Sequence, residues 1–223
     1  MILRQMQELL GDVYDVDVAV DVYDFLVTDR SQLPARARAA STHASQADEA
    51  VILEDNGHDL GLTLYLDAKV HERLLETNPL QTLNEGNIAD YLTAVEGVSH
   101  FMCLAWNANH DKAVSLLELE MQAEIDKYVS ALCLLRAQTP ERFPRELHAV
   151  LFEHAYVDTE LAGDRAGMYR AASELAARFC RHLASRVASA GGSAFDGETL
   201  AELRRFYRLT NLRKREHIQK RVR

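Results

Sequence analysis

The segment 50-AVILEDNGHDLGLTLYL-66 decides the fold of the N-terminal part of the chain. Two β-prone runs flank Asn56-Gly57, and this dipeptide is typical of tight hairpin turns because both residues tolerate positive φ. We therefore predict a β-hairpin at 50–66. After Asp67 the apolar residues recur with helical spacing, and this period continues to the C-terminus.

The sequence before the hairpin has a mixed pattern. Residues 1–10 have helical spacing, whereas Val16–Val22 places four valines on one face of an extended chain. This alternation predicts a third strand within 16–27. The intervening segment 29–49 is rich in Ala, Ser and Arg and predicts an exposed loop. A small antiparallel sheet of about three strands is thus expected in an N-terminal region, 1–80.

The remaining sequence, 81–223, predicts a bundle of about five longer helices. Asn78-Pro79 ends a short helix before it, because the residue preceding proline is displaced from helical geometry. Asp196 is suited to cap the last helix. The fold class is therefore α+β and mainly α, and the two regions are expected to form one compact unit. The predicted helices span about 68–77, 86–107, 114–137, 144–158, 164–189 and 198–218.

Composition bounds the class of protein. The 223 residues are 48% apolar and 26% charged, which is enough to form a hydrophobic core without disulfides. Three well-separated cysteines without a CxxC pair indicate reduced core thiols. No segment has the ~20 apolar residues of a membrane span, and the first residues do not have the pattern of a signal peptide. We expect a cytoplasmic protein without membrane contact.

Two carboxylates one turn apart are the first candidate site. Glu120 and Glu124 fall between two apolar arcs of the 114–137 helix, where paired carboxylates suit acid–base work or a divalent metal ion. Lys127, at i+3 from Glu124, offers an alternative, since an intrahelical ion pair has the same spacing.

Histidines on neighbouring helices extend this candidate site. Glu96 and His100 stand at i, i+4, either as a surface ion pair or as two metal ligands. His154 falls within an apolar stripe, either as a core residue or as a ligand. If the three helices pack side by side, these residues and the two carboxylates converge. However, the chain contains no Glu-x-x-His and no His-Glu-x-x-His motif.

The C-terminal segment is strongly basic. Residues 204–223 hold nine Lys or Arg and one Glu, a net charge of +8, whereas the rest of the chain holds 16 basic and 33 acidic residues, a net charge of −17. Such a segment is either a solvated helix surface or a docking site for an acidic partner, a second copy of the chain, or nucleic acid. Its candidate binding residues are Arg204, Arg205, Arg208, Arg213, Lys214 and Arg215.

Three hypotheses for function follow. The absence of catalytic motifs favours an interaction or regulatory protein that docks a protein partner or a second copy through the acidic body and the basic C-terminal helix. The second hypothesis is a metal-dependent, hydrolytic enzyme with one divalent metal ion as its cofactor. The third is nucleic-acid binding through 204–223, which the acidic body and the pI of about 5.5 disfavour.

Overall fold

The two β-prone runs pair as the sequence predicts. In the computed structural model, which describes residues 1–33, 47–55, 60–141, 144–153, 164–187 and 194–221, strands β2 (Glu49–Asp55) and β3 (Leu60–Leu66) are antiparallel, with Val51 opposite Leu64. The predicted Asn56-Gly57 turn lies outside the described residues. The hairpin itself is confirmed.

The third strand differs from the prediction in length and direction. Strand β1 (Leu26–Val27) pairs in parallel with β3, so the sheet is mixed and has the order β1-β3-β2. The expectation of an all-antiparallel sheet is wrong. The connection from β1 to β2 is long enough to carry the chain past β3 to its other edge, and no short turn fixes the direction of β1.

The alternating valines do not form a strand. Residues 16–21 form a loop, followed by a short 3-10 helix, η1 (Val22–Asp24). The Gln7 side chain satisfies this backbone: it donates to the carbonyl of Val20 at 2.8 Å and accepts from the amide of Val22 at 2.9 Å. Side-chain hydrogen bonds thus replace the ladder that period-2 spacing predicted.

The helices confirm the mainly α character of the chain. Asp196 caps α8 as predicted, accepting from the amide of Thr199. A second 3-10 helix, η2 (Arg30–Gln32), lies in the predicted loop. The helices are α1 (Ile2–Tyr14), α3 (Ala68–Glu76), α4 (Ile88–Ala108), α5 (Leu116–Gln138), α6 (Leu147–Phe152), α7 (Asp164–Val187), α8 (Gly197–Tyr207) and α9 (Asn211–Arg221).

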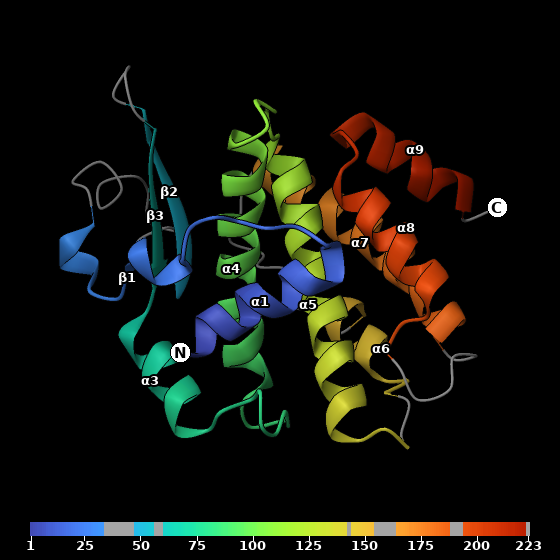
Figure 1. Cartoon of the computed structure of the whole chain (residues 1–223), viewed down its shortest axis with the longest axis horizontal. Helices are drawn as coiled ribbons and strands as arrows, with labels where there is room; N and C mark the ends of the chain where they lie inside the picture. Colours follow the sequence, from blue (N-terminus) through green and yellow to red (C-terminus); the bar gives the residue numbers. More distant parts are fainter. Residues whose placement is uncertain (34–46, 56–59, 142–143, 154–163, 188–193, 222–223) are drawn as a thin grey trace.

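Two helices differ from their predicted bounds. The helix expected at 144–158 begins at Leu147, and residues 154–158 lie outside the described part of the chain. The helix expected at 198–218 divides into α8 and α9 (Figure 1). No glycine or proline marks this division in residues 208–210.

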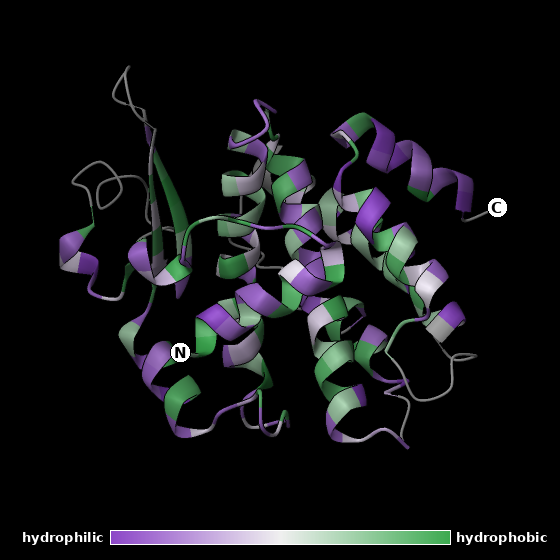
Figure 2. Ribbon diagram, in the orientation of Figure 1, coloured by the Kyte–Doolittle hydropathy of each residue, from purple (hydrophilic) through white to green (hydrophobic). Residues whose placement is uncertain are grey.

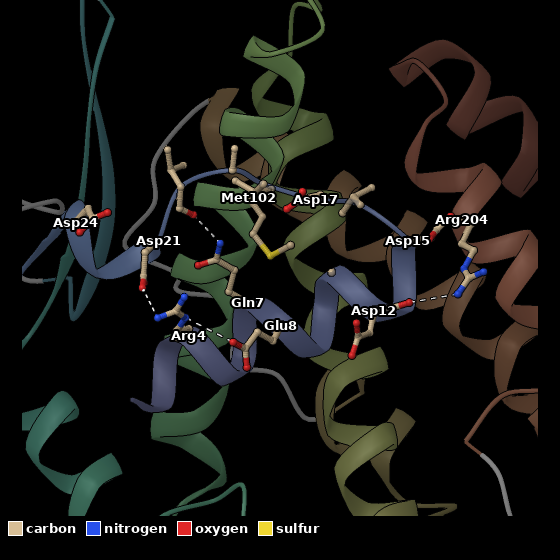
Figure 3. A pocket seen from close by; sticks show the side chains of 15 residues that line it. Arg4, Gln7, Glu8, Asp12, Asp15, Asp17, Asp21, Asp24, Met102 and Arg204 are labelled. Atoms are coloured by element: carbon tan, nitrogen blue, oxygen red, sulfur yellow. Dashed lines mark hydrogen bonds and ion pairs between the residues drawn. The ribbon is translucent and has the colours of Figure 1, made fainter.

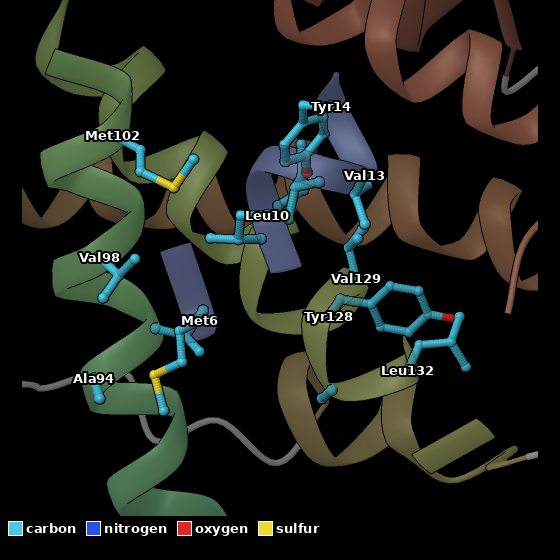
Figure 4. Packing of buried hydrophobic residues seen from close by; sticks show 14 of the residues in the cluster. Met6, Leu10, Val13, Tyr14, Ala94, Val98, Met102, Tyr128, Val129 and Leu132 are labelled. Atoms are coloured by element: carbon cyan, nitrogen blue, oxygen red, sulfur yellow. The ribbon is translucent and has the colours of Figure 1, made fainter. Parts of the chain in front are cut away.

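Helices α4 and α5 pack against each other at the centre of the molecule. The sheet and α3 contact α4, whereas α7 and α6 contact α5 (Figure 1). Helix α1 contacts both central helices, and Figure 4 shows Met6 and Leu10 of α1 near Val98 of α4 and Val129 of α5. The polar side chains of α4 and α5 that face each other or the sheet are therefore enclosed.

One hydrophobic core joins the sheet and the bundle. It includes Leu64 of β3, Phe101 of α4, Phe179 of α7 and Ile218 of α9, all 2% exposed or less. The proposed division at residue 80 stays a prediction.

Candidate metal centre

Polar side chains from three elements meet between the sheet and the two central helices. Glu96 and His100 lie one turn apart on α4, and Glu120 lies on α5. One ligand atom of each lies within 4.8 Å of one of each of the others. The structure thus brings together three of the five residues that the sequence analysis selected, and we call them the Glu96–His100–Glu120 cluster.

His100 is the centre of this cluster. Its Nε2 atom lies 3.7 Å from Oε2 of Glu120, and its Nδ1 atom lies 3.4 Å from Oε1 of Glu49. His100 is 6% exposed and Glu120 9% exposed, so both are largely removed from water. The surface ion pair that was the alternative for Glu96 and His100 does not form: His100 instead pairs with carboxylates of β2 and α5.

Glu49, the first residue of β2, is a functional candidate that sequence reasoning missed. It directly precedes the predicted hairpin and carries no periodicity of its own. Its side chain has room because Gly97 lies opposite: a Cβ atom at Gly97 would be 2.9 Å from Cγ of Glu49 and 2.8 Å from Cδ1 of Leu64. Gly97 inside a predicted helix was the sequence signal for this close approach, because glycine in a helix costs about 1 kcal/mol relative to alanine.

Glu124 is connected to Glu96 of the cluster through Lys127. Lys127 lies with Nζ 2.6 Å from Oε1 of Glu124 and 3.1 Å from Oε2 of Glu96. The intrahelical pair that the spacing allowed is therefore present, and it extends to α4. Together, Glu49, Glu96, Glu120 and Glu124 place four carboxyl groups around one lysine and one histidine.

Burial and charge act in opposite directions on the basic groups. Burial lowers the pKa of His100, but Glu120 and Glu49 outweigh it and raise this pKa to about 10. Burial likewise acts to lower the pKa of Lys127, and Glu96 and Glu124 raise it overall. The imidazole of His100 is thus held as a cation by its carboxylate neighbours.

The carboxyl groups respond according to their neighbours. Burial raises the pKa of Glu49 despite the opposing effect of His100, and it raises that of Glu124 despite Lys127. Burial also acts to raise the pKa of Glu96, but Lys127 and His100 lower it overall. The excess of carboxyl groups over cationic groups therefore has an electrostatic cost that an additional cation would reduce.

Two atoms of the group lack hydrogen bonds. Nε2 of His100 and Oε1 of Glu49 are buried and form no hydrogen bond with other described residues. Buried polar atoms in proteins are almost always hydrogen-bonded, so an exception indicates strain or a ligand. Both atoms belong to side chains that meet at His100, where a cation would have donor atoms around it.

No protein-family model, curated protein or solved structure matches this chain.

The remaining histidine of the sequence analysis and two histidines of the C-terminal helices lie apart from the cluster or outside the described residues. His154, the candidate ligand on the predicted 144–158 helix, lies outside the described residues. His182 contacts Oε2 of Glu202 at 3.4 Å, and His217 contacts Oε1 of the same carboxylate at 2.8 Å. This pairing connects α7, α8 and α9, far along the chain from the cluster.

Much of the basic C-terminal charge is used inside the molecule. Arg204 donates to the carbonyl oxygens of Asp12 and Val13, and Arg208 to those of Tyr14 and Asp15, so both arginines satisfy the C-terminal end of α1. These carbonyls otherwise lack helical partners.

Lys214 lies inside rather than on the surface. It is 1% exposed and pairs with Glu118 at 3.0 Å. Arg213 pairs with Glu216 and stays exposed, as do Arg205 and Arg215. Figure 2 shows that α9 is almost entirely hydrophilic.

An acidic groove lies between α1 and the loop that follows it. Its volume is about 1110 Å³, and the charged groups that line it are mostly carboxylates (Figure 3). Arg4 pairs within it with Asp21 at 3.2 Å and with Glu8 at 3.5 Å. The charged lining residues are Glu8, Asp12, Asp15, Asp17, Asp21, Asp24, Arg4 and Arg204.

No helix in the described part of the chain is both long and apolar enough to cross a membrane.

Proposed function

We propose that this chain binds one divalent metal ion at the Glu96–His100–Glu120 cluster. The observation that carries the proposal is the convergence of three donor atoms within 4.8 Å of one another. Donor atoms about 2.1 Å from one ion are at most about 4.2 Å apart, so small side-chain movements suffice to close the site. Such movements are within the range of glutamate rotamers.

Nε2 of His100 supports the same proposal, because it lies 3.7 Å from Oε2 of Glu120 and forms no hydrogen bond with the other described residues. A metal ion must displace one proton of the His100 cation; it then accepts the lone pair of that nitrogen and leaves the other nitrogen free to donate to a carboxylate. Nδ1 of His100 lies 3.4 Å from Glu49, which is suited to receive that hydrogen. With a metal ion on Nε2, His100 would have a ligand bond on one ring nitrogen and a hydrogen bond to Glu49 on the other.

The donor set indicates the class of metal. Carboxylate oxygens with one imidazole nitrogen suit Mn²⁺, Fe²⁺ or Zn²⁺, whereas Mg²⁺ and Ca²⁺ favour oxygen donors alone. Three protein ligands also leave coordination positions for water, and metal-bound water is a nucleophile near neutral pH. A hydrolytic activity is therefore the chemistry that we propose to assay after metal loading.

Elemental analysis tests the metal. Untagged protein is stripped with chelator, reloaded separately with Mn²⁺ and Zn²⁺, and desalted before metal and protein are measured. We expect about one equivalent per chain. His100→Gln and Glu120→Gln should each reduce this at least tenfold, whereas Glu198→Gln, at a side chain that is 89% exposed, should not. Less than a tenth of an equivalent in the parent protein contradicts the proposal.

Activity is assayed on the same samples. Reloaded protein is incubated with simple phosphate and carboxylate esters, and we expect any hydrolysis to disappear in His100→Gln. Hydrolysis that persists in that variant assigns the activity to another site or to a contaminant.

Docking through charged surfaces is the second candidate function. The acidic groove favours it, because six carboxylates line the groove and α9 exposes the cationic side chains Arg213, Arg215 and Lys220. The two surfaces thus have opposite charges. We propose that α9 of one copy binds the groove of another. Sedimentation at low and high salt tests this: a salt-sensitive dimer is expected, weakened by Arg215→Glu but not by Lys69→Glu on α3. A monomer at low salt contradicts it.

Nucleic-acid binding through 204–223 gains less support. Arg204, Arg208 and Lys214 use their charges in contacts within the molecule. Fewer cationic groups of this segment are therefore available to contact nucleic-acid phosphates than its composition suggests. A gel shift at low salt would test binding through the remaining cationic groups. Cytoplasmic location likewise stays a prediction.

A further inference from the structure

The carboxyl groups around the metal centre divide into two halves that share Glu96. In one half, His100 lies between Glu49 and Glu120; in the other, Lys127 lies between Glu96 and Glu124. Glu96 belongs to both, because it also contributes a donor atom to the metal cluster. Each half thus places one nitrogen group between two carboxylates.

We infer that the ammonium of Lys127 occupies the place of a second cation, and that Lys127 thereby restricts this carboxylate centre to one metal ion. The inference rests on the proposed metal site.

The contacts of Lys127 are those of a bridging cation. Nζ lies 2.6 Å from Oε1 of Glu124 on its own helix and 3.1 Å from Oε2 of Glu96 on α4, so one positive charge joins two carboxylates of adjacent helices. The side chain of Lys127 is 13% exposed. At this burial, the ammonium has few water molecules to replace its carboxylate partners.

A second divalent ion and the ammonium exclude each other. An ion coordinated by Glu96 and Glu124 would lie where Nζ lies, and two cations at contact distance repel strongly in a partly buried site. Removing the ammonium therefore leaves two carboxylates with a position for a cation between them. These are hard oxygen donors, suited to Mn²⁺, Fe²⁺ or Zn²⁺ when they also share Glu96 with the first ion.

Metal stoichiometry tests this inference. Lys127→Met removes the ammonium and leaves an apolar side chain that is one atom shorter, so the place of Nζ is vacated, and we expect this variant to bind two Mn²⁺ per chain where the parent protein binds one. Electron paramagnetic resonance is the second measurement: two Mn²⁺ ions that share Glu96 should give an exchange-coupled spectrum, whereas a single ion gives an isolated six-line spectrum. Lys127→Arg retains the positive charge and should still bind one ion.

Each outcome is decisive. A parent with one ion and a folded Lys127→Met with one ion overturns the inference but leaves the proposed metal site intact. No ion in either protein overturns both. No ion in the parent but one in Lys127→Met supports the role of Lys127 and overturns the proposed site as stated.

Failure of Lys127→Met to fold does not prevent the test. The unpaired carboxylates would then destabilise the metal-free variant, and added Mn²⁺ should restore its circular dichroism spectrum and a cooperative melt. If Mn²⁺ has no such effect at concentrations that load the parent protein, a metal ion does not replace the ammonium and the inference is wrong.

Discussion

Asp126 is a carboxylate that the fold encloses at the centre of the bundle. It is 1% exposed and accepts hydrogen bonds from the hydroxyls of Tyr14 and Ser99 and from the amide of Gln122. Burial raises its pKa to about 6, and the three hydrogen bonds only partly oppose this effect. Ionisation of Asp126 is therefore less favourable in the folded protein than in the unfolded chain.

The consequence is a defined pH dependence of stability. Between the unfolded value of 3.8 and about 6, the folded protein retains a proton that the unfolded chain has lost, so the contribution of Asp126 to stability falls as pH rises through this window. Relative to Asp126→Asn, the parent should lose about 3 kcal/mol between about pH 3 and about pH 7. Urea unfolding of both proteins measures this, and parallel pH profiles would contradict it.

Gly97 makes a second prediction, since its lack of a side chain gives Glu49 its place. In Gly97→Ala the new methyl would lie 2.9 Å from Cγ of Glu49, so Glu49 must move away from His100. We expect metal affinity to fall roughly tenfold, as for the loss of a hydrogen-bonding partner of a ligand. Better helix propensity, about 1 kcal/mol, offsets part of the destabilisation from the tight contact.

Titration calorimetry with Zn²⁺ measures this affinity. Gly167→Ala is the matched control, because Gly167 is also helical and a Cβ atom there meets nothing within 4 Å. It should leave affinity unchanged and increase stability slightly. Equal affinities in all three proteins would show that Glu49 does not act on the site.

At the scale of elements, α9 is held by a buried ion pair. Nζ of Lys214 lies 3.0 Å from Glu118 and 3.1 Å from Oε1 of Gln122, with the rings of Phe206 and Tyr207 each 5.6 Å away. The turn between α8 and α9 allows Lys214 to reach these partners. Ile218 is the only apolar residue of α9 that is buried.

Lys214→Met should therefore destabilise the protein by about 3–5 kcal/mol, because it leaves the carboxylate of Glu118 buried without its counter-ion. Lys220→Met, at an exposed position of the same helix, should change stability by less than about 0.5 kcal/mol. Chemical unfolding measures the stability of both variants and of the double variant Lys214→Met/Glu118→Gln. If adding Glu118→Gln to Lys214→Met does not recover stability, the loss does not come from the unpaired charge of Glu118.

For the whole molecule, periodicity predicts the helices and hairpin well but says little about long-range contacts. Periodicity placed Glu96 and His100 on one predicted helix and Glu120 on the next. Packing of these two helices against each other brings the three side chains together. The contributions of Glu49 and Lys214 depend on tertiary approach, since β2 meets α4 through Gly97 and α9 turns toward α5. The Val16–Val22 alternation failed for the same reason: Gln7 on α1, not a neighbouring strand, binds its backbone.

The metal centre connects parts of the chain that are distant in sequence, so metal binding should stabilise the whole fold. An ion that binds the folded state alone, at 100 times its dissociation constant, contributes about 2.7 kcal/mol. For a chain of this size that raises Tm by about 5–10 °C. Thermal melts with and without Mn²⁺ measure the shift, with His100→Gln as the control that should show none.

Because the ligands lie on α4 and α5, against which the sheet, α1 and α7 all pack, Mn²⁺ should raise the temperature of one cooperative unfolding transition. An equal shift in His100→Gln would instead indicate cation binding elsewhere, for example by the carboxylates of the acidic groove.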